Sequence, residues 1–331
     1  MIRADGFRHE ALLYKTEAEF LSGTTAFIKQ GLAEGAPTLV VVEAAKIRRL
    51  RAALGADAEA VEFADMVAVG QNPARIIPRW RDFVDRHGGR GRPLRGIGEP
   101  VWPGRSPDEL VECRHHEALL NVAFVQSPPF WLLCPYDAST LEPVVVEDAH
   151  GTHPFVCTAD DRQASPDYDG THPHRLFDEP LPDRPPHAPT LQFTELAPVR
   201  EFVRRHVETS DGHRDLSDVV LAVDELAANS LRHGGGQGTL AIWWQGDSLV
   251  CQVEDRGHIV DPLVGRRRPV PTQLNGRGLW ITNQLCRLLQ IRSSPQGTRV
   301  RIHFRNPTRR PWQRRTSRHT WPSTPDLTRC L

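Results

Sequence analysis

Residues 158–190 constrain the fold of this chain more than any other stretch. Aspartate, proline and histidine dominate there, and apolar residues are sparse. Such a composition cannot bury enough surface to fold alone, so we expect a stiff, extended linker. It divides the chain into an N-terminal domain over 1–157 and a C-terminal domain over 191–305. Residues 306–331 are rich in arginine, serine, threonine and proline, which predicts a basic, disordered tail.

The overall charge argues against a polyanionic partner. Lysine plus arginine and aspartate plus glutamate each number 41, and the isoelectric point is near 7.3. We therefore expect no direct binding to nucleic acid by the chain as a whole, although the basic tail leaves an acidic partner or nucleic acid open. The N-terminus has no apolar signal region, and no apolar run reaches the length of a membrane span. These features predict a cytoplasmic protein without a membrane partner.

The six cysteines are scattered and form no CxxC pair. Five of them lie in or near apolar segments, which indicates small core residues. The histidines of the linker, His172, His174 and His187, fit no metal-binding spacing. The sequence therefore supports neither a disulfide framework nor a zinc cluster.

The N-terminal domain alternates predicted strands and helices. Strands are expected over 7–14, 37–42, 61–63, 94–98 and 130–134, and helices over 17–32, 44–54, 73–87 and 107–123. This alternation favours a doubly wound, mainly parallel sheet that is covered by helices on both faces.

Five stretches of this domain resemble the MEDS sensory domain, named after a methanogen/methylotroph regulator. They lie over 9–14, 20–28, 98–105, 116–121 and 134–137. The family is similar to RecA/KaiC-type folds. No Walker A glycine-lysine-serine/threonine run is present, so phosphate binding by this domain is not expected. The resemblance implies a sensory role but not which ligand is sensed.

The C-terminal domain is organised around a helix that contains Glu225 and Asn229. These two residues are four apart, so they share one helical face. Apolar residues recur at helical spacing and form the opposite stripe, namely Leu216, Val219, Val220, Val223, Ala227 and Leu231. An ordinary amphipathic helix with a solvated face would show the same pattern, so the pair needs further support.

That support comes from three motifs downstream. A strand ends in 253–257 (VEDRG), a glycine turn enters a helix over 275–281 (NGRGLWI), and 296–300 (QGTRV) opens another strand. With the helix above, this order resembles the N, G1, G2 and GT boxes of the GHKL ATPase superfamily. Asn229 is followed by His233-Gly234, as in the anti-sigma-factor serine/threonine kinase (RsbW-like) branch. The resemblance implies a two-layer α/β sandwich of GHKL (Bergerat) type.

The resemblance also implies roles for residues that would bind ATP and Mg²⁺. Glu225 would be the catalytic base and Asn229 the Mg²⁺ ligand. Asp255 would accept from the adenine amino group, Gly257 would let the purine lie close to the backbone, and Thr298 would lie near the adenine.

Other positions would contact the phosphates. Gly276 and Gly278 would present backbone N–H groups at a helix N-terminus, and Arg277 would add positive charge. His233 and Leu279 stand in the same boxes and complete the expected nucleotide-binding set. The arginines over 266–268 fall in the expected ATP lid, where they would meet phosphates or remain solvated.

The sequence departs from the family at the G1 box, where the second glycine is absent after Gly257. Asp261-Pro262 nevertheless fits the anti-sigma branch. We therefore expect a cytoplasmic, ATP-dependent serine/threonine protein kinase that is controlled by its sensory domain. Its partners would be a STAS-type anti-sigma antagonist, a sigma factor that it sequesters, or both, and kinases of this branch also suggest a homodimer.

Two alternatives stay open. The protein could bind ATP and act as a stoichiometric regulator without significant turnover. It could also be an atypical sensor histidine kinase, which would need a phospho-accepting histidine on a dimerising helical hairpin. The residues before 190 show no such pattern, and His87, His115 and His116 are interpreted as surface or packed histidines.

Overall fold

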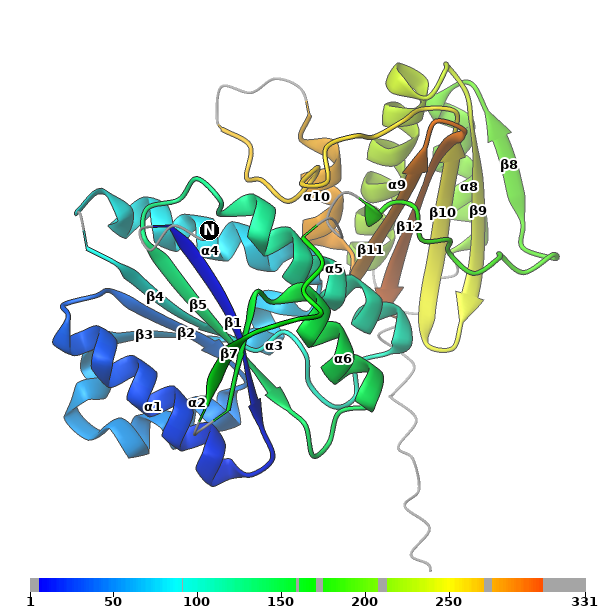
Figure 1. Cartoon of the computed structure of the whole chain (residues 1–331). Helices are drawn as coiled ribbons and strands as arrows, with labels where there is room; N and C mark the ends of the chain where they lie inside the picture. The colour runs from blue at the N-terminus through cyan, green and yellow to red at the C-terminus, as the bar shows by residue number, and fades with distance from the viewer. Residues whose placement is uncertain are drawn as a thin grey trace, which may run out of the picture.

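The computed structural model describes residues 6–90, 92–158, 161–170, 175–207, 213–270 and 276–305. The predicted tail over 306–331 lies outside them. Figure 1 shows two sheets, each with its own helices, joined by the segment that follows β7. Among the described residues, no helix has both the length and the apolar character needed to cross a membrane.

The N-terminal domain contains a seven-stranded sheet in the order β3-β2-β4-β5-β1-β6-β7. All pairs are parallel except β6 and β7, which are antiparallel. The strands are β1 (Phe7–Tyr14), β2 (Thr38–Val42), β3 (Val61–Asp65), β4 (Leu94–Gly98), β5 (Phe130–Asp137), β6 (Phe155–Cys157) and β7 (Arg162–Ala164). β2 and β4 are buried along their whole length, as strands covered on both faces must be.

Helices cover both faces of this sheet, which confirms the doubly wound prediction (Figure 1). α1 (Glu17–Ala33) and α2 (Ala44–Leu54) bury apolar side chains against one face. α4 (Ile76–His87), α5 (Pro107–Ala123) and α6 (Pro143–Thr152) pack on the other, and the short α3 (Met66–Gly70) contributes Met66 there. α5 begins with a complete capping box between Ser106 and Glu109, which fixes where the helix starts.

The C-terminal domain contains a five-stranded antiparallel sheet in the order β11-β12-β10-β9-β8. Its strands are β8 (Thr190–Phe193), β9 (Gly238–Gln245), β10 (Ser248–Asp255), β11 (Leu288–Ser294) and β12 (Gly297–Arg305). α8 (Leu196–His206), α9 (His213–His233) and α10 (Gly278–Leu285) pack on one face around a shared apolar core. The two-layer sandwich is confirmed, and the described residues place three helices on this face.

The stretch predicted as an extended linker needs a correction. Residues 162–164 form β7, which extends the first sheet. Leu176 and Leu181 are buried, and Arg301 on β12 donates a 2.7 Å hydrogen bond to the Pro182 carbonyl. The segment therefore covers part of the second sheet, because its few apolar residues dock on surfaces that the domains provide.

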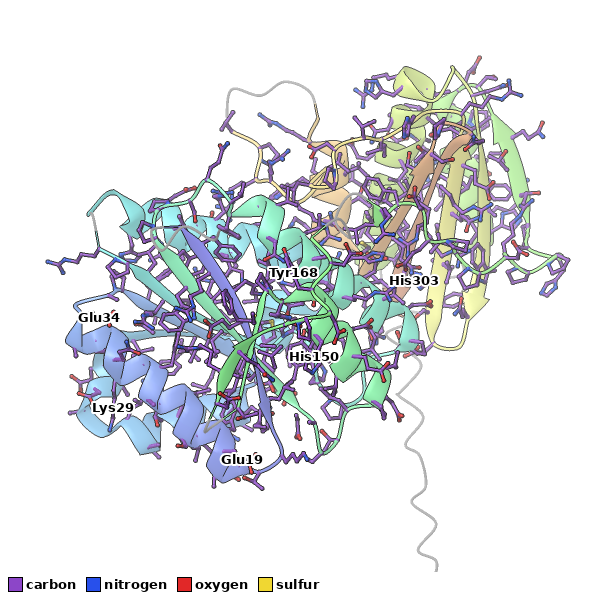
Figure 2. The ribbon with its side chains drawn as sticks, in the orientation of Figure 1. Glu19, Lys29, Glu34, His150, Tyr168 and His303 are labelled. Atoms are coloured by element: carbon purple, nitrogen blue, oxygen red, sulfur yellow. The ribbon has the colours of Figure 1, made fainter. Side chains whose placement is uncertain are left out.

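The two domains share a polar interface. On α5, Glu109 accepts from Arg287 at 3.2 Å and Glu112 accepts from Arg292 at 3.0 Å. Figure 2 shows His303 where the second sheet meets the N-terminal domain, and it lines a small pocket there together with Glu109. The sheet face opposite the three helices is therefore covered by the N-terminal domain and the connecting segment.

A second contact joins the N-terminal domain to one end of α10. Arg75 donates to the Asn283 carbonyl at 2.7 Å and to the Cys286 carbonyl at 2.9 Å. These carbonyls lie at the end of α10, where a helix lacks internal donors, so the guanidinium caps the helix from the other domain.

Candidate functional site

A cavity of about 310 Å³ opens in the C-terminal domain between α9, the sheet and the start of α10. Its volume is near the lower end of the range for small-molecule sites, about 300–1,000 Å³. Apolar side chains and a few polar groups line it: Leu226, Asn229, Ser230, His233, Val253, Asp255, Gly257, His258, Ile259, Val264, Gly276, Gly278, Leu279, Thr298 and Val300. Eight of the ten predicted site residues are among them, and Glu225 and Arg277 are not.

Asp255, at the end of β10, is held by two hydrogen bonds. Ser230 donates its hydroxyl to Oδ2 at 2.6 Å, and the Gly257 amide donates to Oδ1 at 2.7 Å. An ionised carboxylate has acceptor capacity left after two such bonds. Asp255 can therefore accept a further N–H group from a ligand in the cavity.

Glycines allow the backbone to approach Asp255 closely. A Cβ at Gly234 would lie 2.4 Å from the Asp255 side chain, and one at Gly257 would lie 2.8 Å from the His233 carbonyl oxygen. Gly297 has a φ of 150°, and its Cβ would lie 2.5 Å from the Asp255 carbonyl oxygen. A larger residue at any of these positions would displace the Asp255 region.

Thr298 links two of the predicted motifs. It lies opposite Asp255 in the β10–β12 register, and its hydroxyl donates to the Gly257 carbonyl at 2.8 Å. The Ser293 hydroxyl oxygen lies 2.7 Å from the Thr298 hydroxyl oxygen and accepts from the Ile259 amide, also at 2.7 Å. The strand pairing therefore brings together residues that are about forty positions apart in the chain.

Glu225 and Asn229 are half-buried on one face of α9, as the i, i+4 spacing predicts. Gly278, the first residue of α10, lies against both. A Cβ at this position would be 2.6 Å from Glu225 Oε2 and 3.3 Å from Asn229 Nδ2. Glu225 thus lies just beyond the cavity lining and touches Gly278, which does line it.

The glycine turn before α10 has the expected character. Gly276 has a φ of +80°, a left-handed conformation that favours glycine. Arg277 precedes the first residue of α10 and donates to the Val270 carbonyl at 3.4 Å. Leu279 is almost fully buried and lines the cavity, whereas Asn275 lies outside the described residues.

The arginines of the expected lid contact carboxylates in this structure. Arg266 is buried and lies 3.7 Å from Glu112 of the N-terminal domain. Arg268 pairs with Asp82 of the same domain at 3.0 Å, and Arg267 pairs locally at 2.5 Å with Asp261. Their expected contact with phosphates stays a prediction, because in this arrangement Arg266 and Arg268 pair with carboxylates of the other domain.

Sequence reasoning missed Ser230, which orients Asp255. Its position next to Asn229 on a helix that faces the site was the available signal. It also missed the apolar walls, because Val253, Ile259 and Val300 look like ordinary core residues in the sequence. Apolar walls, one fixed carboxylate and a glycine-lined helix N-terminus suit a purine nucleotide.

Two family models match separate parts of this chain. Residues 8–154 match the MEthanogen/methylotroph, DcmR Sensory domain family, and residues 190–304 match the histidine kinase-like ATPase domain family. Among solved structures, the chain is similar to the RsbU and RsbW domains of Rv1364c from Mycobacterium tuberculosis, with 23% identity and a TM-score of 0.27. That match covers 35% of this chain and 32% of the other. No curated protein matches the chain.

Proposed function

Because the chain joins an N-terminal MEDS sensory domain to a C-terminal histidine kinase-like ATPase domain, we propose that it is a sensor-controlled, ATP-dependent serine/threonine protein kinase of the anti-sigma type. The ATPase family implies that ATP binds in the C-terminal domain. The kinase reaction, a STAS-type anti-sigma antagonist as its substrate, and sequestration of a sigma factor are our inference. They rest on the residues Asn229 to Gly234 and on the arrangement around Gly278.

The observation that carries the proposal is that the side chains of Glu225 and Asn229 both lie against Gly278. A carboxylate and an amide from α9 meet the N-terminus of α10 beside a cavity whose far wall holds Asp255. Catalysis of phosphoryl transfer depends mainly on positioning and electrostatic stabilisation, so groups that converge from separate elements are what it requires.

ATP, when bound, would supply the phosphoryl group, and Asp255 with the glycine-lined backbone would hold its adenine. The Asn229 amide oxygen would hold Mg²⁺, a hard cation that prefers oxygen ligands and keeps several waters. In this structure that oxygen accepts a 3.2 Å hydrogen bond from Arg232, which would have to release it. Glu225, one helical turn away, would accept the proton of a serine or threonine hydroxyl.

The contact between Arg75 and α10 connects the sensory domain to this site. α10 has eight residues and is therefore only about 12 Å long. Gly278 at its start touches Glu225, while the carbonyls near its end are capped by Arg75 of the sensory domain. A change in the sensory domain that moves Arg75 would thus shift the phosphate end of the site.

The test is transfer of label from γ-labelled ATP, with Mg²⁺, to candidate antagonist proteins of the same genome. The full-length chain is compared with Glu225→Gln and with Glu201→Gln, an exposed carboxylate on α8 that serves as the matched control. Loss of a general base reduces rates by about 10²–10⁴-fold. We expect acid-stable label on the antagonist, retained by the control and lost with Glu225→Gln.

Other outcomes would move the assignment. Acid-labile label on the protein itself would favour a histidine kinase. ATP binding without transfer to any antagonist would favour a stoichiometric regulator. Equal transfer by wild type and Glu225→Gln would refute the role of Glu225 as the base, and turnover by Asn229→Ala would refute the magnesium assignment.

A further inference from the structure

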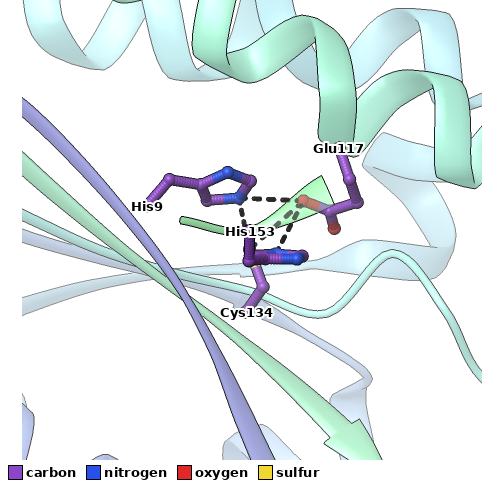
Figure 3. Close-up of side chains that lie close together, drawn as sticks. All are labelled: His9, Glu117, Cys134 and His153. Carbon is purple, nitrogen blue, oxygen red and sulfur yellow. Dashed lines mark hydrogen bonds and ion pairs between the residues drawn. The ribbon is translucent and has the colours of Figure 1, made fainter. Parts of the chain in front are cut away.

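Four side chains that could ligate a metal converge inside the N-terminal domain, far from the nucleotide cavity. They are His9 on β1, Glu117 on α5, Cys134 on β5 and His153, which directly follows α6. Figure 3 shows them pointing toward one another. Each is at most 1% exposed, so the cluster is sealed from solvent in this arrangement.

The spacing of the ligand atoms suits a tetrahedral ion. In a tetrahedron with ligand bonds of about 2.0–2.3 Å, neighbouring ligand atoms lie roughly 3.3–3.7 Å apart. Glu117 Oε2 lies 3.0 Å from His9 Nε2, 3.4 Å from His153 Nε2 and 3.5 Å from Cys134 Sγ. His9 Nε2 lies 3.4 Å from Cys134 Sγ, and all four atoms are within 4.8 Å of one another.

The outer nitrogens of both imidazole rings are held by oxygen atoms. His9 Nδ1 lies 3.2 Å from Asn121 Oδ1, and His153 Nδ1 lies 2.8 Å from the Ala149 carbonyl oxygen. Metal-ligating histidines almost always donate their second N–H to an oxygen in this way, which turns Nε2 toward the ion. Both rings are therefore oriented as metal ligands would be.

Two buried polar atoms of the cluster lack a hydrogen-bond partner. They are His153 Nε2 and Glu117 Oε1. Leaving such atoms unsatisfied in the interior is costly, and a buried carboxylate is costlier still unless a cation neutralises it. A cation held by these four side chains would bond to His153 Nε2 and would neutralise the Glu117 carboxylate.

We propose that His9, Glu117, Cys134 and His153 bind one divalent, zinc-type cation. The ligand set contains two neutral nitrogens, one carboxylate and one thiolate, so a dication balances its charge. Binding displaces the Cys134 thiol proton to solvent. Four protein ligands complete the tetrahedron, which makes this a closed, structural or regulatory site rather than a catalytic one.

The sequence gives the opposite expectation because the ligands are far apart in the chain. No two of them share a motif, and Cys134 looks like a core residue in a buried strand. The fold assembles the site: β1 and β5 are adjacent parallel strands with Ala11 opposite Cys134, so His9 and Cys134 meet on the face that α5 and α6 cover. The proposal therefore departs from the expectation of no zinc cluster, and the topology of the sheet is the reason.

The experiment uses the full-length chain, without a histidine tag, purified under reducing conditions and loaded with Zn²⁺ alone. Metal is quantified by mass spectrometry after exhaustive dialysis. We expect one zinc per chain, lost in Cys134→Ser and His153→Gln. Cys157→Ser, a buried thiol on β6, and His150→Gln, on α6, are the matched controls that should keep the metal.

Substitution with Co²⁺ tests the geometry and the thiolate directly. A tetrahedral cobalt spectrum with a thiolate charge-transfer band should appear in wild type and in Cys157→Ser, and the band should vanish in Cys134→Ser. Asn121→Ala keeps all four ligands but removes the oxygen that orients His9. It should weaken the affinity about 10–100-fold.

The variants are first checked for folding by circular dichroism, so that loss of metal is not confused with loss of structure. Wild-type protein that holds no zinc and gives no cobalt spectrum would overturn the proposal. So would undiminished zinc content in Cys134→Ser, and so would unchanged affinity in a folded Asn121→Ala.

Discussion

Glu112 ties the two domains together, and replacing it by glutamine should destabilise the protein in a pH-dependent way. Its carboxylate is buried on α5 and lies 3.0 Å from Arg292 and 3.7 Å from Arg266, both in the C-terminal domain. His115 on the same helix is 3.5 Å away. Glutamine keeps the shape but removes the charge, so the arginines would lose a partner inside the interface.

The size of the expected destabilisation follows from the pKa of the Glu112 carboxyl group. Burial alone would raise the pKa of Glu112, but His115, Arg292 and Arg266 outweigh it and lower the pKa from 4.5 to about 2. Such a difference corresponds to about 3 kcal/mol at neutral pH. Removing one partner of a buried ion pair typically destabilises a protein by about 3–5 kcal/mol, which is an independent estimate of similar size.

The sign of the pH dependence is fixed by the lowered pKa. The stabilisation by Glu112 is fully present above pH 4.5 and is lost as the pH falls through about 2. Denaturant unfolding of wild type and Glu112→Gln should therefore differ by about 3 kcal/mol at pH 7, and less with increasing acidity below pH 4.5. Glu147→Gln, an exposed carboxylate on α6, is the control. If both variants change stability by less than about 0.5 kcal/mol, the interface does not depend on this ion pair.

Three further predictions follow from single contacts. Gly278→Ala should push the Glu225 carboxylate away and reduce phosphoryl transfer with little change in stability, whereas Gly151→Ala on α6, which meets open space, should leave transfer unchanged. Glu99 directly follows β4 and is almost fully buried. Burial raises its pKa from 4.5 to about 7, so its contribution to stability is present below pH 4.5 and is lost as the pH rises through 7. In denaturant unfolding, the free energy of unfolding of Glu99→Gln should rise relative to that of wild type by about 3 kcal/mol between pH 4.5 and 8. A difference between the two proteins that stays constant over this range would contradict the assignment. Arg75→Ala should uncap α10 and change the ATP affinity, which is measured by calorimetry. An unchanged affinity would mean that this contact does not couple the sensory domain to the site.

The architecture of both domains could be predicted because it depends on local patterns. Continuous β-branched runs between helices, such as residues 38–42, predict parallel strands without reference to the rest of the chain. Most residues named from the sequence around Asp255 line one cavity, because the resemblance to known boxes carries the order of these parts, while their binding roles stay predictions. Placing Glu225 beside Gly278 needed the structure, since it depends on how α9 and α10 pack.

What the sequence could not predict depends on long-range contacts. The partners of Arg266 and Arg268 lie in the other domain, and nothing near these arginines in the chain indicates Glu112 or Asp82. The same reason applies to His153, which lies next to Glu117 because α6, the helix that it follows, packs beside α5. Pairwise spacing within one segment detects helix faces and turns, but not clusters that are assembled from four separate elements.

The contacts of α5 give a physical route between the two domains. Glu117 faces the proposed metal cluster, while Glu112, on the same helix, faces Arg266 of the segment expected to close over the phosphates. The two carboxylates are about 7.5 Å apart along the helix axis, so α5 cannot shift at one without shifting at the other. While Glu112 holds Arg266, that arginine is unavailable to a nucleotide. A rearrangement at Glu117 that moves α5 would therefore also move the carboxylate of Glu112 that pairs with Arg266.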